Sequence, residues 1–277
     1  IDSDFEKQIF LKYEEGIFLV RSWILNCINE KMSNNPYEIS ERITNFVYFL
    51  AFHKKTSFEV PQDIKNYLDE IAFVLANKIE FNNEELSGNH IINNARALII
   101  FGYFFNSDKH FNLGKELLSY MLPKLIYDEL FLRESSSHYQ YLFTSWIFEI
   151  YIISQEKNDI SLKLSLENYL SNLINGCLFF KTGKDDEYVL IGDISPDKNP
   201  KWLENITSIF LTLSKKQDVN KFNTGWASMI SNIFDLNKYK FNFSEIKFND
   251  FHFYEEAGYL KLKKFKWLIF KHIEKNT

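Results

Sequence analysis

A run of polar and ionisable side chains interrupts the apolar chain at the stretch LRESSSHYQYLF. If a helix begins near Glu134, then Ser135, His138 and Tyr139 share one face at spacings of three and four residues, and Arg133 lies just ahead of the first turn. Helix capping explains one serine and Glu134, because a helix N-terminus favours hydroxyl caps and negative charge. Capping does not explain why Arg133, His138 and Tyr139 converge. Such a group can bind an anion and transfer protons, although a plain ion-pair network has the same composition.

A second polar cluster lies in the stretch SGNHIINNARAL. Asn89 and His90 follow Gly88 at an expected helix start, and Asn94 comes one turn after His90 on the same face. Such a group of amides beside a histidine could form part of a polar site. Asparagine also caps helices well, so a purely structural role is the alternative interpretation.

The stretch IGDISPD is a third candidate, with Gly192 and Asp193 in an expected loop. Asp193 could contact a substrate, whereas an aspartate after a glycine is also common in ordinary turns. Glu134 and Asp193 are the one pair of carboxylates that would suit a glycoside hydrolase, which needs an acid and a base or nucleophile. The sequence has no HExxH motif and no Cys/His set, so we expect neither a metal nor another cofactor.

The composition is that of a globular protein, with 45% apolar and 25% charged residues among 277. The net charge is −5 and basic residues are spread along the chain, which argues against a nucleic-acid partner. No run of about 18 uncharged apolar residues occurs, so we expect no membrane span. Cys27 and Cys177 lie in apolar surroundings and are expected to be buried thiols.

Helical periodicity extends almost to residue 235. In the first segment, IFLKYEEGIFLVRSWILNCI, apolar residues recur at helical spacing: Phe10, Leu11, Ile17, Phe18, Trp23, Ile24 and Leu25. They predict the buried stripe of an amphipathic helix. About seven long helical segments, joined by short polar links, predict antiparallel hairpins arranged in a curved or closed ring. Two further helices are expected near 201–215 and 222–235, after a loop at 181–200 that contains glycine and proline.

The last part of the chain alternates between apolar and polar residues, most clearly in YLKLKKFKWLIFKHI. Alternation of this kind predicts strands, with a turn at Glu255 to Gly258. An isolated hairpin is marginally stable, so these strands must pack against the helices or against further strands. We therefore expect the first strands of a sheet domain whose remainder lies beyond Thr277.

Together, the motifs resemble those of the heparinase II/III-like polysaccharide lyases. The resemblance rests on GNHIINNARAL, on LRESSSHYQYL with the helix through Trp146 and Glu149, and on IGDISPD, in this order along the chain. It implies a mainly α fold, with an incomplete α/α toroid of antiparallel helical hairpins at 1–240. The toroid would be followed by an antiparallel β-sandwich that begins at 241–277 and is incomplete in this chain.

The resemblance also implies an activity, the cleavage of an acidic, uronate-containing polysaccharide by β-elimination. It assigns neutralisation of the uronate carboxylate to Asn89 and His90, and the acid, sometimes also the base, to Tyr139. The remaining site residues it implies are Arg133 and His138 beside the tyrosine, and Glu134, Asn94 and Asp193 as substrate contacts. Relatives would place the enzyme in the bacterial periplasm or outside the cell.

Two departures from the family pattern concern the substrate. Relatives commonly have a glycine where this chain has Glu129, and a glutamate where it has Asn93. In many members a histidine of the sheet domain is the base. We therefore expect the part of the β-sandwich beyond Thr277 to complete the site, and the 277-residue chain alone to be inactive or feeble.

The residue types fit the chemistry of β-elimination. The proton next to a charged carboxylate is very weakly acidic, so donors that neutralise the carboxylate stabilise the dianion that develops. Tyr139 can protonate the expelled oxygen, and a fixed cation such as Arg133 would lower the pKa of a phenol enough for it to act as a base. The alternatives are an α/α-toroid glycoside hydrolase and a helical carbohydrate-binding or scaffold protein without catalysis.

Overall fold

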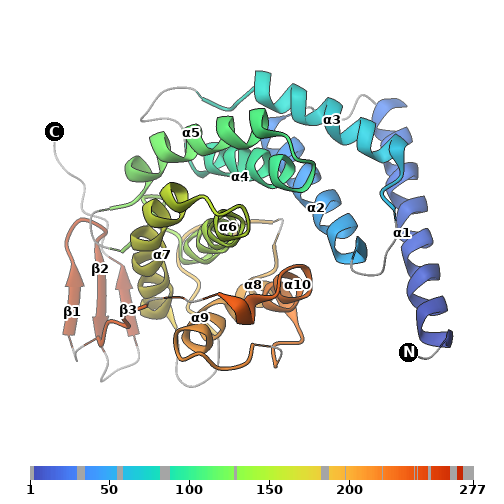
Figure 1. Ribbon diagram of the computed structural model, residues 1–277. Coiled ribbons are helices and arrows are strands. Elements are labelled where there is room, and N and C mark those ends of the chain that lie inside the picture. Colours follow the sequence, from blue (N-terminus) through green and yellow to red (C-terminus); the bar gives the residue numbers. More distant parts are fainter. Residues whose placement is uncertain are drawn as a thin grey trace.

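The protein is mainly helical and carries a small antiparallel sheet near the end of the chain (Figure 1). The computed structural model describes residues 3–29, 35–54, 59–81, 88–127, 130–181, 187–196, 198–219, 221–239, 241, 243–248, 251–262 and 267–270. Among these residues, no helix is both long and apolar enough to span a membrane.

Seven long helices precede three short ones in the described part of the chain. The long helices are α1 (Ser3–Asn29), α2 (Pro36–Lys54), α3 (Gln62–Asn77), α4 (Asn89–Phe104), α5 (Asp108–Leu125), α6 (Ser137–Glu156) and α7 (Ile160–Phe180). The short ones are α8 (Pro200–Leu203), α9 (Ile206–Ser214) and α10 (Gly225–Ile233), followed by a 3₁₀ turn at Leu236–Lys238. The helix expected near 201–215 is thus divided into α8 and α9.

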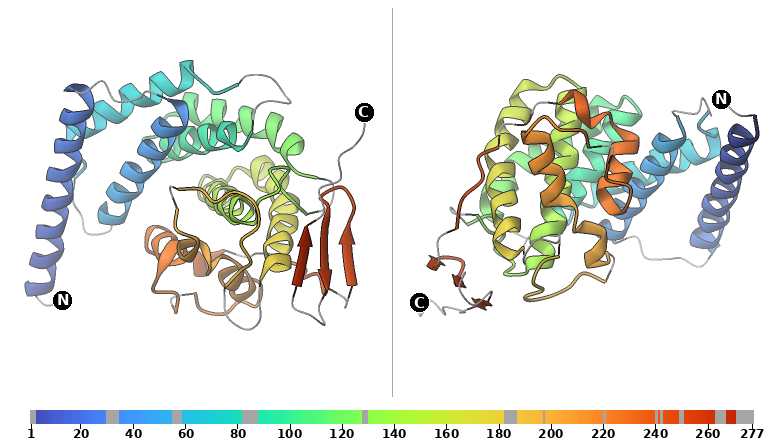
Figure 2. Two further views of the ribbon diagram at one scale, coloured as in Figure 1. Left: turned by 180° about the vertical axis from the view of Figure 1, so that it is seen from behind. Right: turned by 90° about the horizontal axis from the view of Figure 1, so that it is seen from below.

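Alternate helices form two layers. α2, α4 and α6 lie inside an arc made by α1, α3, α5 and α7, and both views in which the arc is visible agree on this arrangement (Figures 1 and 2). α4 and α6 are apolar on nearly all sides and buried over most of their length, as expected for helices enclosed by others.

The three inner helices run in the same direction. Near their starts, the Asn94 amide of α4 donates to Ser40 Oγ of α2 at 3.0 Å. Further along, the Tyr48 phenol of α2 donates to Glu149 of α6 at 2.9 Å, and the rings of Tyr48 and Phe104 are 6.4 Å apart. Three parallel inner helices bring three helix N-termini to one end of the molecule.

The stripe predicted for α1 is only partly right, because Ile17 is buried and Trp23 and Ile24 are half-buried, whereas the other four residues are not. Its buried face consists of Tyr13, Ile17, Val20 and Cys27, whereas Phe10, Leu11, Phe18 and Leu25 are exposed. The first helix has apolar residues on two faces, and periodicity alone does not say which of them contacts α2. The prediction that Cys27 and Cys177 are buried free thiols is confirmed.

The sheet contains three antiparallel strands in the order β1 (Phe251–Tyr254), β2 (Tyr259–Leu262) and β3 (Trp267–Phe270). The turn predicted at Glu255 to Gly258 joins β1 to β2, with Tyr254 paired to Tyr259. As expected, the hairpin does not stand alone, since the rings of Tyr254 and Tyr259 pack against Phe131 of the helical part at 5.0 and 4.8 Å. Residues 271–277 lie outside the described part of the chain.

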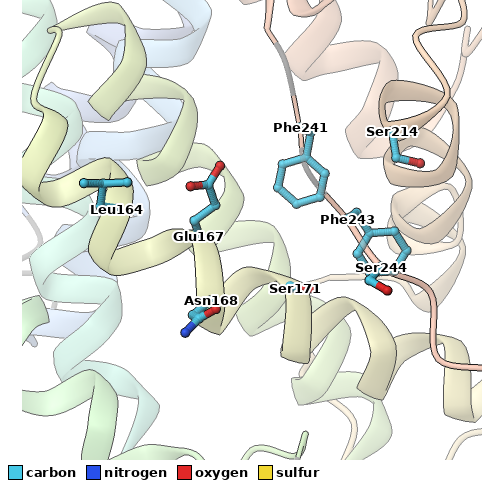
Figure 3. Close-up of a pocket in the computed structure, with 8 residues that line it drawn as sticks. All are labelled: Leu164, Glu167, Asn168, Ser171, Ser214, Phe241, Phe243 and Ser244. Atoms are coloured by element: carbon cyan, nitrogen blue, oxygen red, sulfur yellow. The ribbon is translucent and has the colours of Figure 1, made fainter.

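A surface pocket of about 660 Å³ lies between α7, α9 and the segment that leads to the sheet (Figure 3). Its lining residues are Leu164, Glu167, Asn168, Ser171, Ser214, Phe241, Phe243 and Ser244. None of them belongs to the motifs from which the candidate site was predicted.

Candidate functional site

The two distinctive motifs meet at the N-terminal ends of α4 and α6. The backbone N–H of Asn89 donates to Glu134 Oε1 at 2.8 Å, and its side-chain amide donates to Glu134 Oε2 at 2.6 Å. Gly88, immediately before α4, leaves room for this contact, because a Cβ there would lie 3.1 Å from Glu134 Oε1. One carboxylate therefore joins two stretches that are 45 residues apart in the sequence.

The third motif is hydrogen-bonded to the N-terminal end of α6. Ser137 and Ile191 exchange hydrogen bonds, Ser137 N to Ile191 O at 3.0 Å and Ile191 N to Ser137 Oγ at 2.8 Å. Ser136 Oγ donates to Asp193 O at 2.6 Å. Gly192 between them has φ +74°, and a Cβ there would lie 2.6 Å from Ser135 O. Only glycine fits this conformation and this close approach without strain.

Ser136 caps α6, since its hydroxyl accepts a hydrogen bond from Tyr139 N at 3.1 Å. The predicted capping serine is thus present, but α6 begins at Ser137 rather than near Glu134. Ser135 lies outside the helix with φ +54°. The shared helical face predicted for Ser135, His138 and Tyr139 is therefore wrong, and Glu134 bonds to the start of α4 instead of capping its own helix.

The pKa of Glu134 is raised above its ordinary value. Desolvation by the surrounding protein is the main cause, and the nearby Asp193 carboxylate adds to it. The Asn89 N–H and His90 act in the opposite direction without cancelling the effect. Glu134 is thus protonated at a higher pH than a solvated glutamate, which gives it the capacity to donate a hydrogen bond.

Five of the predicted site residues are accessible to solvent. His90, Arg133, Glu134 and Asp193 are exposed, and Tyr139 is half-buried in the first turn of α6. The His90 ring packs at 4.5 Å from the Tyr37 ring, and its Nδ1 lies 3.1 Å from Glu80 Oε1. The Arg133 guanidinium lies 5.5 Å from the centre of the Tyr127 ring. That Arg133 lowers the pKa of Tyr139 stays a prediction.

Three predicted site residues are buried, and direct contact with a polysaccharide is not compatible with this arrangement. Asn89 is 3% exposed because Glu134 covers its amide, so it orients Glu134 rather than touching a uronate. Asn94 is 0% exposed, and its amide oxygen accepts from Glu80 N at 3.0 Å. His138 is also 0% exposed, with Nδ1 2.9 Å from the Tyr188 hydroxyl. The family resemblance implied site roles for all three, and a sequence motif does not show which of its side chains are buried.

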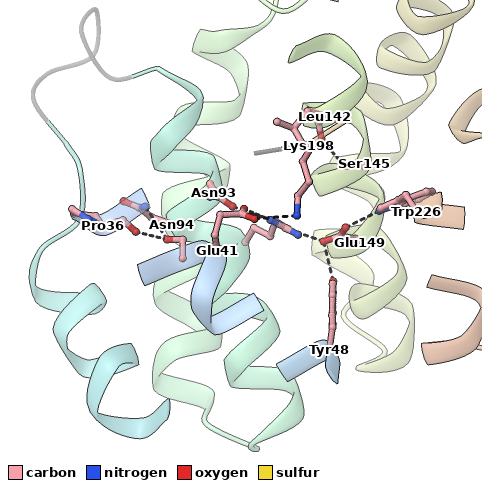
Figure 4. Close-up of polar contacts among 12 residues, drawn as sticks. Pro36, Glu41, Tyr48, Asn93, Asn94, Leu142, Ser145, Glu149, Lys198 and Trp226 are labelled. Atoms are coloured by element: carbon pink, nitrogen blue, oxygen red, sulfur yellow. Dashed lines mark hydrogen bonds and ion pairs between the residues drawn. The ribbon is translucent and has the colours of Figure 1, made fainter. Parts of the chain in front are cut away.

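A buried ionic network below the site was missed by sequence reasoning (Figure 4). At its centre, Arg96 Nε of α4 donates to Glu149 Oε2 of α6 at 2.6 Å, and both side chains are almost fully buried. Glu149 also accepts from Tyr48 at 2.9 Å and from the Trp226 indole at 2.8 Å. A second branch runs from Arg96 to Glu41 of α2 at 3.0 Å.

The network extends to the loop that carries the third motif. Lys198 Nζ lies 3.5 Å from Glu41 Oε2. Positive and negative charges therefore alternate from Lys198 through Glu41 and Arg96 to Glu149. Burial raises the pKa of Glu41, but Arg96 and Lys198 outweigh it and hold the pKa below its ordinary value. These charges fix α2, α4 and α6 relative to one another beneath the exposed site residues.

The arrangement offers exposed donors, a carboxyl group with a raised pKa and a phenol. Among the described residues, no three His, Cys, Asp or Glu side chains are grouped as metal ligands would be. No family model, no curated protein and no solved structure matches the chain significantly.

Proposed function

We propose that this chain is the helical part of a polysaccharide lyase that cleaves a uronate-containing polysaccharide by β-elimination. The observation that carries the proposal is the Asn89–Glu134 contact, which joins the two distinctive motifs at one solvent-accessible helix end. Alternation of inner and outer helices supports the finer proposal of an incomplete α/α toroid (Figure 2). By the same proposal, the three strands begin a β-sandwich.

The substrate carboxylate is neutralised by His90 and by the protonated form of Glu134. A carboxylic acid beside a carboxylate donates a short, charge-assisted hydrogen bond, and the raised pKa of Glu134 favours this form. Asn89 holds Glu134 in place through two hydrogen bonds. Arg133 adds positive charge at the surface for a polyanion. These roles replace the direct contact first expected of Asn89.

The elimination itself needs a base and an acid. The base takes the proton from the carbon next to the uronate carboxylate, a carbon–carbon double bond forms, and the glycosidic carbon–oxygen bond breaks. Tyr139 donates its phenolic proton to the departing oxygen. The base is Tyr139 itself, which starts deprotonated and passes the proton that it takes to the departing oxygen, or, as the family resemblance implies, a histidine of a sheet domain.

Substitution of Tyr139 tests this assignment. In the full-length protein we expect Tyr139→Phe to lower kcat about 10²- to 10⁴-fold, the usual contribution of a positioned acid, while polysaccharide binding and Tm stay close to wild type. Tyr120→Phe, an exposed tyrosine on α5, is the matched control and should leave kcat unchanged. Wild-type turnover by Tyr139→Phe would exclude the mechanism.

One observation favours a second candidate, a glycoside hydrolase. The proximity of Asp193 contributes to the raised pKa of Glu134, as in enzymes where one carboxyl group is the acid and its neighbour the base. The variant Asp193→Asn distinguishes the lyase from the glycoside hydrolase. It abolishes hydrolysis that depends on the carboxylate, whereas elimination should persist within a few-fold, because Ser136 bonds to the backbone oxygen of Asp193.

A further inference from the structure

Polar side chains form one wall of the pocket between α7 and α9. Glu167, Asn168 and Ser171 come from neighbouring turns of α7, and the other side is lined by Ser214 of α9 and Ser244 of the segment that leads to the sheet (Figure 3). Carboxylate, amide and hydroxyl groups together offer both donors and acceptors, as a row of sugar hydroxyls requires.

A hydrogen bond from Tyr151 of α6 holds Glu167 in position. The buried phenol of Tyr151 donates to Glu167 Oε1 at 3.2 Å. Burial, together with the charge of Glu167, raises the pKa of Tyr151 and keeps the phenol protonated as a donor. A carboxylate has about four acceptor positions, so one bond to Tyr151 leaves most of them for a ligand.

The opposite wall is aromatic. Phe241 and Phe243 stack with their ring centres 6.2 Å apart and an interplanar angle of 19°. In Figure 3 the carboxylate of Glu167 is directed across the gap towards Phe241. A pyranose ring has an apolar C–H face and a polar hydroxyl edge, so it can contact both walls at once.

We propose that this pocket binds a neutral oligosaccharide. Among the described residues that line it, Glu167 is the one charged side chain, and its carboxylate repels uronates and favours uncharged sugars. The volume of about 660 Å³ lies within the usual range for small-molecule sites. The pocket shares no lining residue with the surface at the start of α4 and α6, and binding here does not depend on the proposed elimination.

Isothermal titration with cellohexaose, mannohexaose and xylohexaose tests the proposal. We expect at least one of them to bind the 277-residue chain, and Asn168→Ala and Phe243→Ala to weaken that binding by about ten-fold or more, the loss of roughly 1.4 kcal/mol. Asn168 is exposed, so its variant reports on binding without disturbing the fold. Asn112→Ala, an exposed asparagine on α5, is the matched control.

Three results would overturn the proposal. They are no binding of any neutral hexasaccharide up to about 10 mM, equal affinity in wild type and Asn168→Ala, and tighter binding of hexagalacturonate than of its neutral counterparts. Because no turnover is measured, failure of the lyase assignment leaves this outcome unaffected.

Discussion

At the scale of single residues, Arg96 of α4 and Glu149 of α6 form a buried ion pair, with Nε and Oε2 2.6 Å apart. Isolated opposite charges in NARALII and WIFEIYII are the signal that could have predicted this pair, because a lone charge in an apolar helix needs a partner. Which partner it finds depends on three-dimensional packing. The sequence motifs therefore predicted which stretches would come together, but not which of their side chains would be buried.

Removing one charge from this network should destabilise the protein strongly. Arg96→Met leaves Glu149 and Glu41 without their main cation, and we expect a loss of about 3–5 kcal/mol in the free energy of unfolding. Arg21→Met is the matched control, since Arg21 pairs with Asp63 on the surface and should contribute less than about 1 kcal/mol. Urea denaturation measures both, and equal small losses would contradict a structural role for the network.

At the scale of elements, close packing of helix on helix sets the positions of the motifs. Gly102 of α4 faces the start of α5, where an added Cβ would lie 2.5 Å from Phe111 N. Gly114 of α5 makes the reciprocal approach, at 2.6 Å from Ala95 O. The two glycines allow the α4–α5 hairpin to close tightly, and α4 carries Asn89 at its start.

Gly102→Ala tests this packing. Alanine is the better helix former by about 1 kcal/mol, so local propensity alone predicts stabilisation. We expect instead a loss of about 1–3 kcal/mol, because the new methyl group would meet the backbone of Phe111. Ser119→Ala, at an exposed position of α5, serves as the control. A rise in Tm for Gly102→Ala would show that the two helices separate easily.

Elements were more predictable than their contacts. Periodicity predicted the seven long helices and the hairpin turn at Glu255 to Gly258, because these patterns are local. It did not predict the buried face of α1, the division between α8 and α9, or the start of α6 at Ser137. Each of these depends on contacts with distant segments, such as the bonds from Ser137 to Ile191.

At the scale of the whole molecule, buried histidines make stability depend on pH. Desolvation lowers the pKa of His138 below the ordinary value of 6.5, and His53 and His110 are shifted in the same direction. Below about pH 6.5 the unfolded chain therefore binds protons that the folded chain does not. Histidine protonation does not affect the free energy of unfolding above that pH, and lowers it as the pH drops through that value. At still lower pH, protonation of Glu41 removes further stability.

The measurement is Tm between pH 8 and pH 5. We expect Tm to decrease over this interval, and His138→Gln to make the decrease shallower, because glutamine can bond to the Tyr188 hydroxyl without titrating. If Tm decreased with pH as steeply in the variant as in wild type, His138 would not contribute to the pH dependence.

The central proposal is that residues at the start of α4 and α6 catalyse β-elimination, which forms a carbon–carbon double bond in the product. The most direct test is to incubate the full-length protein with a panel of uronate-containing polysaccharides and to follow ultraviolet absorbance and reducing ends together. Elimination creates an unsaturated uronate, so absorbance should rise in step with the reducing ends for wild type and not for Tyr139→Phe. Reducing ends without new absorbance, or an absorbing product from Tyr139→Phe at the wild-type rate, would contradict the lyase.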